Sequence, residues 1–325
     1  MKLYVVLILR IMCGICLLAT NAYGETEQEG LDWLKIVIFA EHQNNYSGVF
    51  VYQYDNHVET SKITHVVDQS GEFERLERLD GPKREILRHH GQVWSHQGHD
   101  EEQVGSQQTR GKFPSLLPEQ LTALSSNYRA DLIGKERVAG YDAQVIVFQP
   151  RDNLRYTHKV WVHTDSGLLL KAAVLDSKGK LVEQYAFTQL QIGGKIDRSW
   201  IKRNASKTFH DTGFQEQHNQ MGFPVNSGWV ADSLPVGFRK TMEIQRPMHG
   251  NHAPVVQIVF SDGLSAISIF IELDDGDEDD VEGLSTRGAM SLYHKVVGKY
   301  LYTVVGEVPA HTVMRVLDSI RNNIK

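Results

Sequence analysis

The sequence predicts an α+β protein in which a large, curled antiparallel sheet packs on helices and a smaller α+β domain follows. Residues 141–194 form the clearest meander: four apolar or alternating runs are separated by short turns rich in Asp, Asn, Ser and Gly. Strands joined by such short turns are antiparallel neighbours, because a parallel pair needs a long crossover. A Gly- and Pro-containing segment after residue 213 separates these strands from a second set that ends in a helix.

Residues 1–24 have the features of a signal peptide and stay outside the fold. Lys2 and Arg10 are their only charges, and Ala22-Tyr23-Gly24 is a small-x-small cleavage pattern. Arg10 divides the apolar run into two pieces, and each piece is too short to span a bilayer. An uncleaved N-terminal anchor is the alternative.

Both cysteines, Cys13 and Cys16, lie in this leader, so the expected mature chain has none. This excludes disulfides, thiolate metal sites and cysteine nucleophiles from the mature protein. An exported chain without disulfides needs a hydrophobic core, which about 300 residues are able to supply.

The charge of the mature chain is concentrated in one run. Without the leader, 32 basic residues face 40 acidic ones, and eight of the acids lie between Glu272 and Glu282. The rest of the mature chain is therefore balanced. Proteins that bind nucleic acid carry a basic surface, so this distribution and the expected export both argue against nucleic acid as a partner.

The first part of the mature chain predicts a helix followed by a long sheet. Leu31, Leu34 and Ile38 recur at helical spacing between residues 25 and 43, and further apolar residues predict burial against a sheet. From residue 46 to residue 97 the apolar period changes to two, which predicts strands near 46–54, 60–67, 72–79, 84–89 and 92–95. His99 to Lys112 is polar and predicts an exposed, mobile loop.

Order resumes at Phe113-Pro114, and residues 118–126 predict a short helix with Leu121 and Leu124 facing inward. A strand over 132–138 leads into the meander. The resulting sheet has roughly eight or nine strands, and a twisted antiparallel sheet of that size tends to curl. A helix on its concave side would fill the space that the curl encloses.

The expected division of the chain is a signal peptide at 1–24, a sheet domain at 25–213, a linker at 214–227 and a small α+β domain at 228–325. Gly222 and Pro224 are typical of a linker. The second domain predicts strands over 255–260, 267–271, 289–296 and 300–305. Pro309 then starts a terminal helix, whose apolar face holds Val313, Val316, Leu317 and Ile320.

The sequence contains no enzyme motif. Gly283 to Gly288 misses the Gly-x-Ser-x-Gly spacing of a nucleophile elbow by one residue, and no Gly-Lys pair has the other residues of a phosphate loop. There is no His-Glu-x-x-His helix and no Gly-x-Gly-x-x-Gly turn. We therefore expect a binding protein rather than an enzyme, with no catalytic residue, no cofactor and no metal site.

Two polar clusters have a functional and a simpler interpretation. Imidazoles and a carboxylate that suit Zn or Cu lie close together in the sequence at His89, His90, His96, His99 and Asp100. An exposed polar hairpin tip is the simpler and favoured interpretation. The acidic run from Glu272 to Glu282 suggests Ca²⁺, but it lacks the glycine and glutamate spacing of an EF-hand loop, so a solvated loop is favoured.

Two surfaces are candidate binding sites. A basic strip, which would meet acidic protein or lipid head groups, is expected where neighbouring strands bring together Arg75, Arg78, Lys83, Arg84 and Arg88. An ordinary solvated sheet face is the simpler interpretation. A lipid cavity or its mouth would be lined by Trp94, Phe113, Leu116, Leu117, Tyr156 and Trp161. Such large apolar residues are also typical of a plain core.

Specific blocks of sequence run through both domains. In the first domain they are Arg78-Leu79-Asp80-Gly81-Pro82-Lys83-Arg84-Glu85, Arg137-Val138-Ala139-Gly140-Tyr141, Pro150-Arg151-Asp152-x-x-Arg155-Tyr156, Gly167-Leu168-Leu169-Leu170-Lys171 and Glu183-Gln184. In the second they are Leu234-Pro235-x-Gly237-Phe238, Phe260-Ser261-Asp262-Gly263-Leu264 and Val304-Val305-Gly306-Glu307-Val308-Pro309. In this order, over nearly all of the mature chain, the blocks resemble the RseB/MucB family of periplasmic sigma-E regulatory proteins.

The resemblance implies a large N-terminal domain shaped like the lipoprotein carrier LolA, a half-open β-barrel with helices in its mouth, and a small C-terminal domain after a linker. It implies a periplasmic negative regulator of sigma-E type envelope-stress signalling. Such a protein binds the periplasmic part of a membrane anti-sigma factor of the RseA/MucA type and shields it from regulated proteolysis. Lipopolysaccharide or lipoprotein acyl chains would relieve the shielding, and a homodimer is implied. The alternative is a periplasmic lipid or lipoprotein carrier or chaperone of the LolA type.

Overall fold

The computed structural model describes residues 30, 32–37, 39–40, 42–89, 92–97, 100–103, 124–201, 222–247, 254–274, 276 and 282–323. The expected signal peptide lies outside these residues. None of the helices in this part of the chain is long and apolar enough to cross a membrane.

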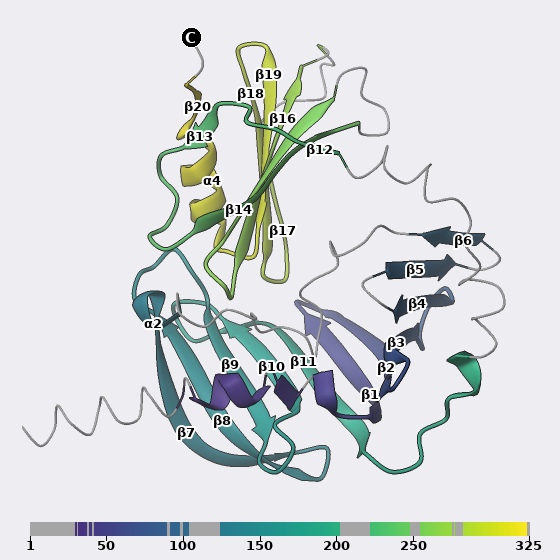
Figure 1. Ribbon diagram of the computed structural model, residues 1–325. Helices are drawn as coiled ribbons and strands as arrows, with labels where there is room; N and C mark the ends of the chain where they lie inside the picture. Colours follow the sequence, from purple (N-terminus) through teal and green to yellow (C-terminus); the bar gives the residue numbers. More distant parts are fainter. Residues whose placement is uncertain are drawn as a thin grey trace, which may run out of the picture.

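Eleven strands form one antiparallel sheet, in the order β6-β5-β4-β3-β2-β1-β11-β10-β9-β8-β7 (Figure 1). Along the chain they are β1 (Tyr46–Tyr54), β2 (His57–Asp68), β3 (Gly71–Arg78), β4 (Arg84–His89), β5 (Gln92–Gln97), β6 (Asp100–Gln103), β7 (Tyr128–Val138), β8 (Tyr141–Pro150), β9 (Thr157–His163), β10 (Leu169–Leu175) and β11 (Leu181–Ile192). The first strand pairs with the last, from Tyr46 opposite Ile192 to Tyr54 opposite Glu183. The sheet is therefore two antiparallel meanders joined at β1 and β11.

The predicted meander is confirmed as β8 to β11, and the predicted strands of the first meander are confirmed as β1 to β5. The prediction of a loop at His99–Lys112 was wrong at its start, because Asp100–Gln103 pair with β5 as strand β6. The residues of β6 are all polar, so they lack the alternation of apolar and polar residues from which a strand is predicted. The short helix α2 (Leu124–Asn127) begins with Leu124, which is fully buried as predicted.

The core of the large domain lies between one face of this sheet and the N-terminal helical residues, drawn in purple in Figure 1. Residues 30, 32–37, 39–40 and 42–43 are helical. Leu34 and Val37 from this segment are buried against strand residues such as Phe50, Val160 and Leu169. The predicted packing of a helix on the large sheet is confirmed.

A bulge curls the sheet at its β7 edge. The pairing of β7 with β8 shifts between Leu132 and Gly134, where Gly134 has a φ of 131°, a value that favours glycine. The end of this hairpin reaches β11, where the Tyr141 hydroxyl donates to the Leu190 carbonyl at 3.1 Å. A second cluster of buried side chains, including Trp161, lies at this end.

The second sheet has the order β12-β14-β15-β16-β19-β18-β17. Its strands are β12 (Phe223–Pro224), β14 (Arg239–Arg246), β15 (Val255–Ser261), β16 (Ala266–Leu273), β17 (Gly283–Arg287), β18 (Met290–Val297) and β19 (Tyr300–Gly306). Helix α4 (Ala310–Leu317) packs Val313, Val316 and Leu317 on one face of it, as predicted. The prediction of Ile320 on this helical face was wrong, because the helix ends at Leu317 and Ile320 pairs with Ala231 as a strand. A separate pair is formed by β13 (Trp229–Ala231) and β20 (Ile320–Asn322).

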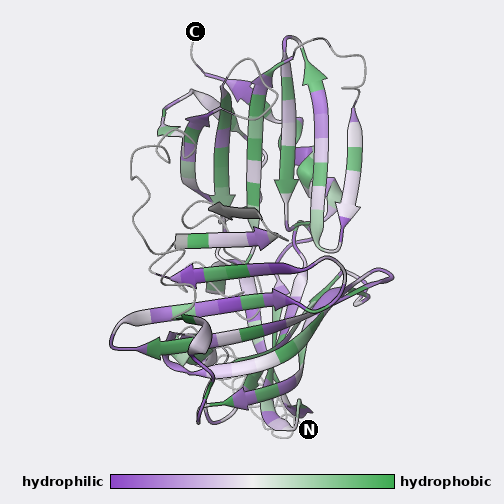
Figure 2. Cartoon of the chain, turned by 90° about the vertical axis from the view of Figure 1, so that its right-hand side faces the viewer, coloured by the Kyte–Doolittle hydropathy of each residue, from purple (hydrophilic) through white to green (hydrophobic). Residues whose placement is uncertain are grey.

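Several strands of the second sheet are absent from the sequence-based prediction. β12 lies inside the expected linker and pairs with β14, and neither β14 nor β17 was expected. β17 is exposed over most of its length, so its pairing partner, rather than its own hydropathy, makes it a strand. Figure 2 shows the alternation of apolar and polar residues that marks several other strands. Two sheets with few helices confirm the predicted α+β class.

Candidate functional site between the two domains

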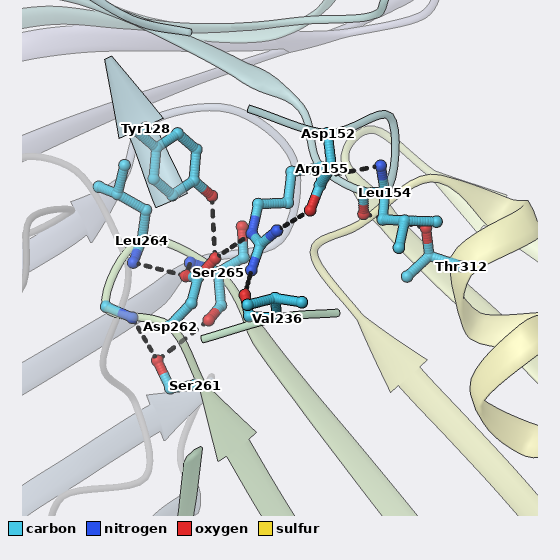
Figure 3. Close-up of polar contacts among 11 residues, drawn as sticks. Tyr128, Asp152, Leu154, Arg155, Val236, Ser261, Asp262, Leu264, Ser265 and Thr312 are labelled. Carbon is cyan, nitrogen blue, oxygen red and sulfur yellow. Dashed lines mark hydrogen bonds and ion pairs between the residues drawn. The ribbon is translucent and has the colours of Figure 1, made fainter. Parts of the chain in front are cut away.

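The two sheets meet at their loops, and two polar contacts join them. The first contact, here called the Arg155 contact, comprises Tyr128, Asp152, Arg155, Val236 and Asp262 (Figure 3). The second, here called the turn contact, comprises Tyr52, Glu183, Gly288 and Ala289. Each contact joins residues of the large sheet domain to residues of the small one.

Arg155 stands at the centre of the first contact. Its side chain is 1% exposed and its Nε donates to Asp262 Oδ2 at 2.5 Å, while the Asp262 side chain is fully buried. The two terminal nitrogens donate to the Asp152 carboxylate and to the Val236 carbonyl. The guanidinium also lies 5.1 Å from the centre of the Phe238 ring, where cation–π attraction adds to the contact. A buried charge of this kind is tolerated because every part of it has a partner.

Asp262 is held in place by its own turn between β15 and β16. Its Oδ1 accepts the backbone N–H groups of Leu264 at 3.0 Å and Ser265 at 2.8 Å. Its Oδ2 also accepts the Tyr128 hydroxyl at 3.1 Å. Burial, followed by the Asp262 charge, raises the pKa of Tyr128, so the phenol remains a donor. Leu264 from the same turn is buried in the core of the large domain.

Local turn chemistry prepares both sides of the Arg155 contact. Asp152 accepts the N–H of Leu154 at 3.0 Å and so stabilises the β8–β9 turn that carries Arg155. Across the contact, Gly237 has a φ of 91°, and a Cβ added there would lie 2.2 Å from the Asn127 side chain. Only glycine allows the Val236 loop to approach the large domain this closely.

Helix α4 adds hydrogen bonds to the same β8–β9 turn. Thr312 is buried, and its hydroxyl donates to the Leu154 carbonyl at 2.9 Å. His311 Nε2 lies 2.9 Å from the Asn153 carbonyl, to which it donates. The small domain therefore contacts the β8–β9 turn on two sides, through helix α4 and through the Arg155 contact.

The turn contact places the β17–β18 turn on strands β1 and β11. The Glu183 carboxylate accepts the Ala289 N–H at 2.9 Å and the Tyr52 hydroxyl at 2.9 Å. A Cβ added to Gly288 would lie 2.3 Å from Glu183 Oε2, and Gly288 has a φ of 56°. At the rim, Arg287 lies over the Tyr54 ring. The positive φ therefore favours glycine, and a larger residue would displace the Glu183 carboxylate.

Two carboxyl groups near the turn contact have shifted pKa values. Burial raises the pKa of Glu183, although the Ala289 amide and the Tyr52 hydroxyl oppose the shift. Burial, together with the Glu183 charge, raises the pKa of Glu307 to about 7. Perturbed carboxyl groups are typical of functional positions, which directs attention to this contact.

The predicted basic strip is divided between the two faces of the sheet. Arg88 lies opposite Glu74 in the β3–β4 register and pairs with its carboxylate, whereas the neighbouring pair places Arg75 opposite Leu87. Successive residues of a strand point to opposite faces, so Arg75 and Arg88 do not share a face. Arg75 forms its own ion pair with Glu85.

The other three members of the strip lie at the β3–β4 turn or next to it. Arg78 lies 3.6 Å from Asp80 and 3.8 Å from Glu59, while Lys83 and Arg84 are exposed. Acidic partners therefore accompany Arg75, Arg78 and Arg88, and the role of the strip stays a prediction.

The described candidates for the lipid cavity lie in three different places. Trp94 is 4% exposed and packs with Phe73, Leu87 and Trp200, apart from the main core. Trp161 lies between Val160 and Val162, which face the helix, so it points to the opposite side of the sheet. Tyr156 is buried beside Arg155. Phe113, Leu116 and Leu117 lie outside the described residues.

The histidine cluster is only partly described. His89 stacks on Phe73, with ring centres 3.9 Å apart, and His96 lies on β5. His90 and His99 lie outside the described residues, as does most of the acidic run after Asp274. Within the part of the chain that the structure describes, no group of three His, Cys, Asp or Glu residues is placed to hold a metal ion.

The interface residues belong to no enzyme or metal motif of the sequence, but several of them lie in the blocks that carry the family resemblance. Three of the blocks that carry the family resemblance contain Arg155, Gly237 and Asp262, and these residues meet at the Arg155 contact. Two more blocks contain Glu183 and Glu307. Nothing local in the sequence predicts that Arg155 pairs with Asp262, which lies 107 residues away.

Comparison with known proteins gives matches over both domains. The model of the MucB/RseB N-terminal domain matches residues 29–205, and that of the MucB/RseB C-terminal domain matches residues 224–321. The sigma factor AlgU regulatory protein MucB of Pseudomonas aeruginosa is 33% identical over 304 residues, covering 89% of this chain and 90% of MucB. The sigma-E factor regulatory protein RseB of Escherichia coli is 23% identical, covering 96% of each chain.

Solved structures of MucB share the fold. The complex structure of Pseudomonas aeruginosa MucA/MucB contains a chain that is 30% identical, with a TM-score of 0.72, covering 91% of this chain and all of that one. MucB in complex with MucA(peri) gives a TM-score of 0.70, covering 90% of this chain and 99% of that one.

Proposed function

The chain belongs to the MucB/RseB family, and on that premise we propose that it is a periplasmic negative regulator of envelope-stress signalling. It binds the periplasmic domain of an anti-sigma factor of the MucA/RseA type and shields that domain from regulated proteolysis. It is not an enzyme, and its action is binding alone. The observation that carries the proposal is that a relative which this chain covers almost completely was crystallised with MucA(peri).

The architecture supports regulation by coupling of two domains. The buried Arg155 contact and the turn contact hold the small domain in one position on the large sheet. A ligand that favours another arrangement would weaken partner binding, and by linkage the partner would weaken ligand binding by the same factor. Lipopolysaccharide or a lipoprotein acyl chain is the proposed ligand.

Titration calorimetry tests the proposal directly. The periplasmic domain of the MucA-like protein from the same organism is titrated into the exported chain, with and without lipid A. We expect specific binding that lipid A weakens. Absence of binding under both conditions would refute the regulator, whereas unchanged affinity in lipid A would refute only the linkage.

A lipid or lipoprotein carrier remains the second candidate, because part of the helical segment carries exposed apolar side chains. Ile36 is 46% exposed and Phe39 is 66% exposed. Exposed apolar groups on an otherwise packed helix are typical of a ligand-binding face. A carrier would bind lipid A and fail to bind the anti-sigma factor domain, so the same titrations separate the two functions.

A further inference from the structure

The turn contact brings two carboxyl groups, Glu183 and Glu307, to the same part of the domain interface. Glu183 lies on β11 of the large sheet, and Glu307 directly follows β19 of the small one. Both side chains are half-buried, and among the described residues neither forms an ion pair. Two ionised carboxyl groups repel each other when they lie close together in a site that water reaches poorly and that holds no cation.

The strand register places Glu183 and Glu307 beside the same short segment, residues 289–291. Glu183 accepts the Ala289 N–H, which fixes the start of β18 against β11. Ser291, two residues further along β18, lies opposite Gly306, the residue before Glu307. The hydroxyl of Ser291 donates to the Val308 carbonyl at 2.8 Å, which holds the other side of Glu307. Both carboxyl groups therefore flank the beginning of β18.

The other titratable groups around this pair do not neutralise it. Tyr52 and Tyr185 stack with ring centres 4.2 Å apart, and burial raises the pKa of each phenol, as it does for Tyr156. These phenols stay neutral near neutral pH. The nearby cation, Arg287, lies 3.3 Å from the Glu59 carboxylate and forms an ion pair with it.

We propose that Glu183 and Glu307 form a proton-dependent clasp between the domains. With Glu307 protonated and Glu183 ionised, the β17–β18 turn stays on β1 and β11, and with both ionised their repulsion releases the turn. In this clasp Glu183 carries the charge, since the Ala289 amide and the Tyr52 hydroxyl oppose the rise in pKa that burial causes there. This inference concerns domain docking and does not depend on which partner the protein binds.

The direction of the pH effect follows from the pKa of Glu307. In the docked domains this pKa is about 7, above the ordinary value of 4.5 that an exposed glutamate has after separation. Docking therefore takes up a proton. The favourable contribution is complete below pH 4.5 and is lost as the pH rises through about 7. We expect the docking constant to fall roughly tenfold or more between about pH 5 and 8.

Single-molecule energy transfer measures docking in the exported chain. Dyes are attached through Lys178→Cys and Lys299→Cys, which replace exposed residues in turns of the large and the small domain. The undocked fraction is measured from about pH 5 to 8 for the otherwise unchanged protein, for Glu307→Gln, and for Asp165→Asn as a control. Asp165 is an exposed carboxylate in the β9–β10 turn.

We expect the undocked fraction to rise about tenfold with pH in the unchanged protein and in Asp165→Asn, and to stay low in Glu307→Gln. Glu183→Gln is the second variant, because its amide oxygen still accepts the Ala289 N–H while the charge is gone. It should move the transition to lower pH values or abolish it, because without the Glu183 charge Glu307 ionises more readily. An undocked fraction that does not change with pH, or glutamine variants that respond like the unchanged protein, would overturn the clasp.

Discussion

The ion pair between Arg155 and Asp262 allows the sharpest test of how the domains are held together. We consider Arg155→Met, which keeps the aliphatic length beside Phe238 and removes the charge. Both side chains of the pair are at most 1% exposed, so solvent screening does not weaken it. Removing one partner of such a pair costs about 3–5 kcal/mol in general.

The structure places the cost at the lower end of that range. After the substitution, Asp262 still accepts two backbone N–H groups and the Tyr128 hydroxyl, so its charge is not left without partners. The Val236 carbonyl loses its donor. We therefore expect the small domain to lose about 3 kcal/mol of stabilisation, which corresponds to roughly 2 M in the urea midpoint of a domain of this size.

Urea unfolding followed by fluorine NMR of 5-fluorotryptophan gives a separate signal for each domain. Trp229 reports on the small domain, and the other tryptophans precede it in the chain. Arg129→Met is the matched control, since Arg129 pairs with Asp131 on the same strand and is 53% exposed. Exposed pairs contribute about 0–1 kcal/mol.

A double-mutant cycle with Asp262→Asn isolates the pair itself. We expect a coupling energy of about 2 kcal/mol, because contacting residues in one polar network are not additive. The reasoning fails if the two substitutions add within about 0.5 kcal/mol, or if Arg155→Met shifts the Trp229 transition no more than Arg129→Met does.

Two further predictions concern the turn contact and the buried His65 on strand β2. Gly288→Ala should weaken docking by about 1–3 kcal/mol, because the added methyl group collides with Glu183. Gly298→Ala is the control, since both substitutions place alanine at a positive φ but only the first causes a collision. Gly298 has a φ of 67° and no atom within 4 Å of an added Cβ, so equal effects of the two variants in the same energy-transfer assay would contradict this. His65 is 1% exposed and pairs with Glu72 at 2.9 Å; burial lowers its pKa, but the bonds to Glu72 and the Asn44 carbonyl outweigh that and raise it. The loss of stability caused by His65→Gln should therefore be largest below about pH 6.5 and should vanish as the pH rises through the raised pKa of His65. Melting curves of the two proteins across this pH range measure the difference. A difference that does not depend on pH would contradict the prediction.

The sequence predicted the parts of the fold whose signals are local. The turns of the β8–β11 meander carry their own Asp, Asn and Gly residues, and helix α4 carries its apolar face within eight residues. Strands β6 and β17 were missed because their residues are polar and their place in a sheet comes from the neighbouring strand. Edge strands of this kind have no alternation for a single sequence to show.

The candidate site was harder to predict, because its geometry is made by residues far apart in the chain. Arg155 looks like an ordinary turn residue, and Asp262 looks like part of a Ser-Asp-Gly turn. The structure shows that each performs its local role and a long-range one: Asp262 accepts the amides of its own turn with one oxygen and Arg155 with the other. Both residues lie in blocks that carry the family resemblance, but only the fold brings them into contact.

The chemistry of the interface suits a protein that must open as well as close. Apart from Leu264, the contacts between the domains described above are mostly hydrogen bonds and ion pairs, with two cation–π contacts. If the domains separate, water hydrates Arg155, Asp262 and Glu183, which offsets much of the loss. An apolar interface of similar extent would gain nothing from water on opening, since exposing apolar surface is unfavourable. A polar interface therefore keeps the docked and the separated arrangement close in free energy, so that a bound ligand or a proton is able to shift the equilibrium between them.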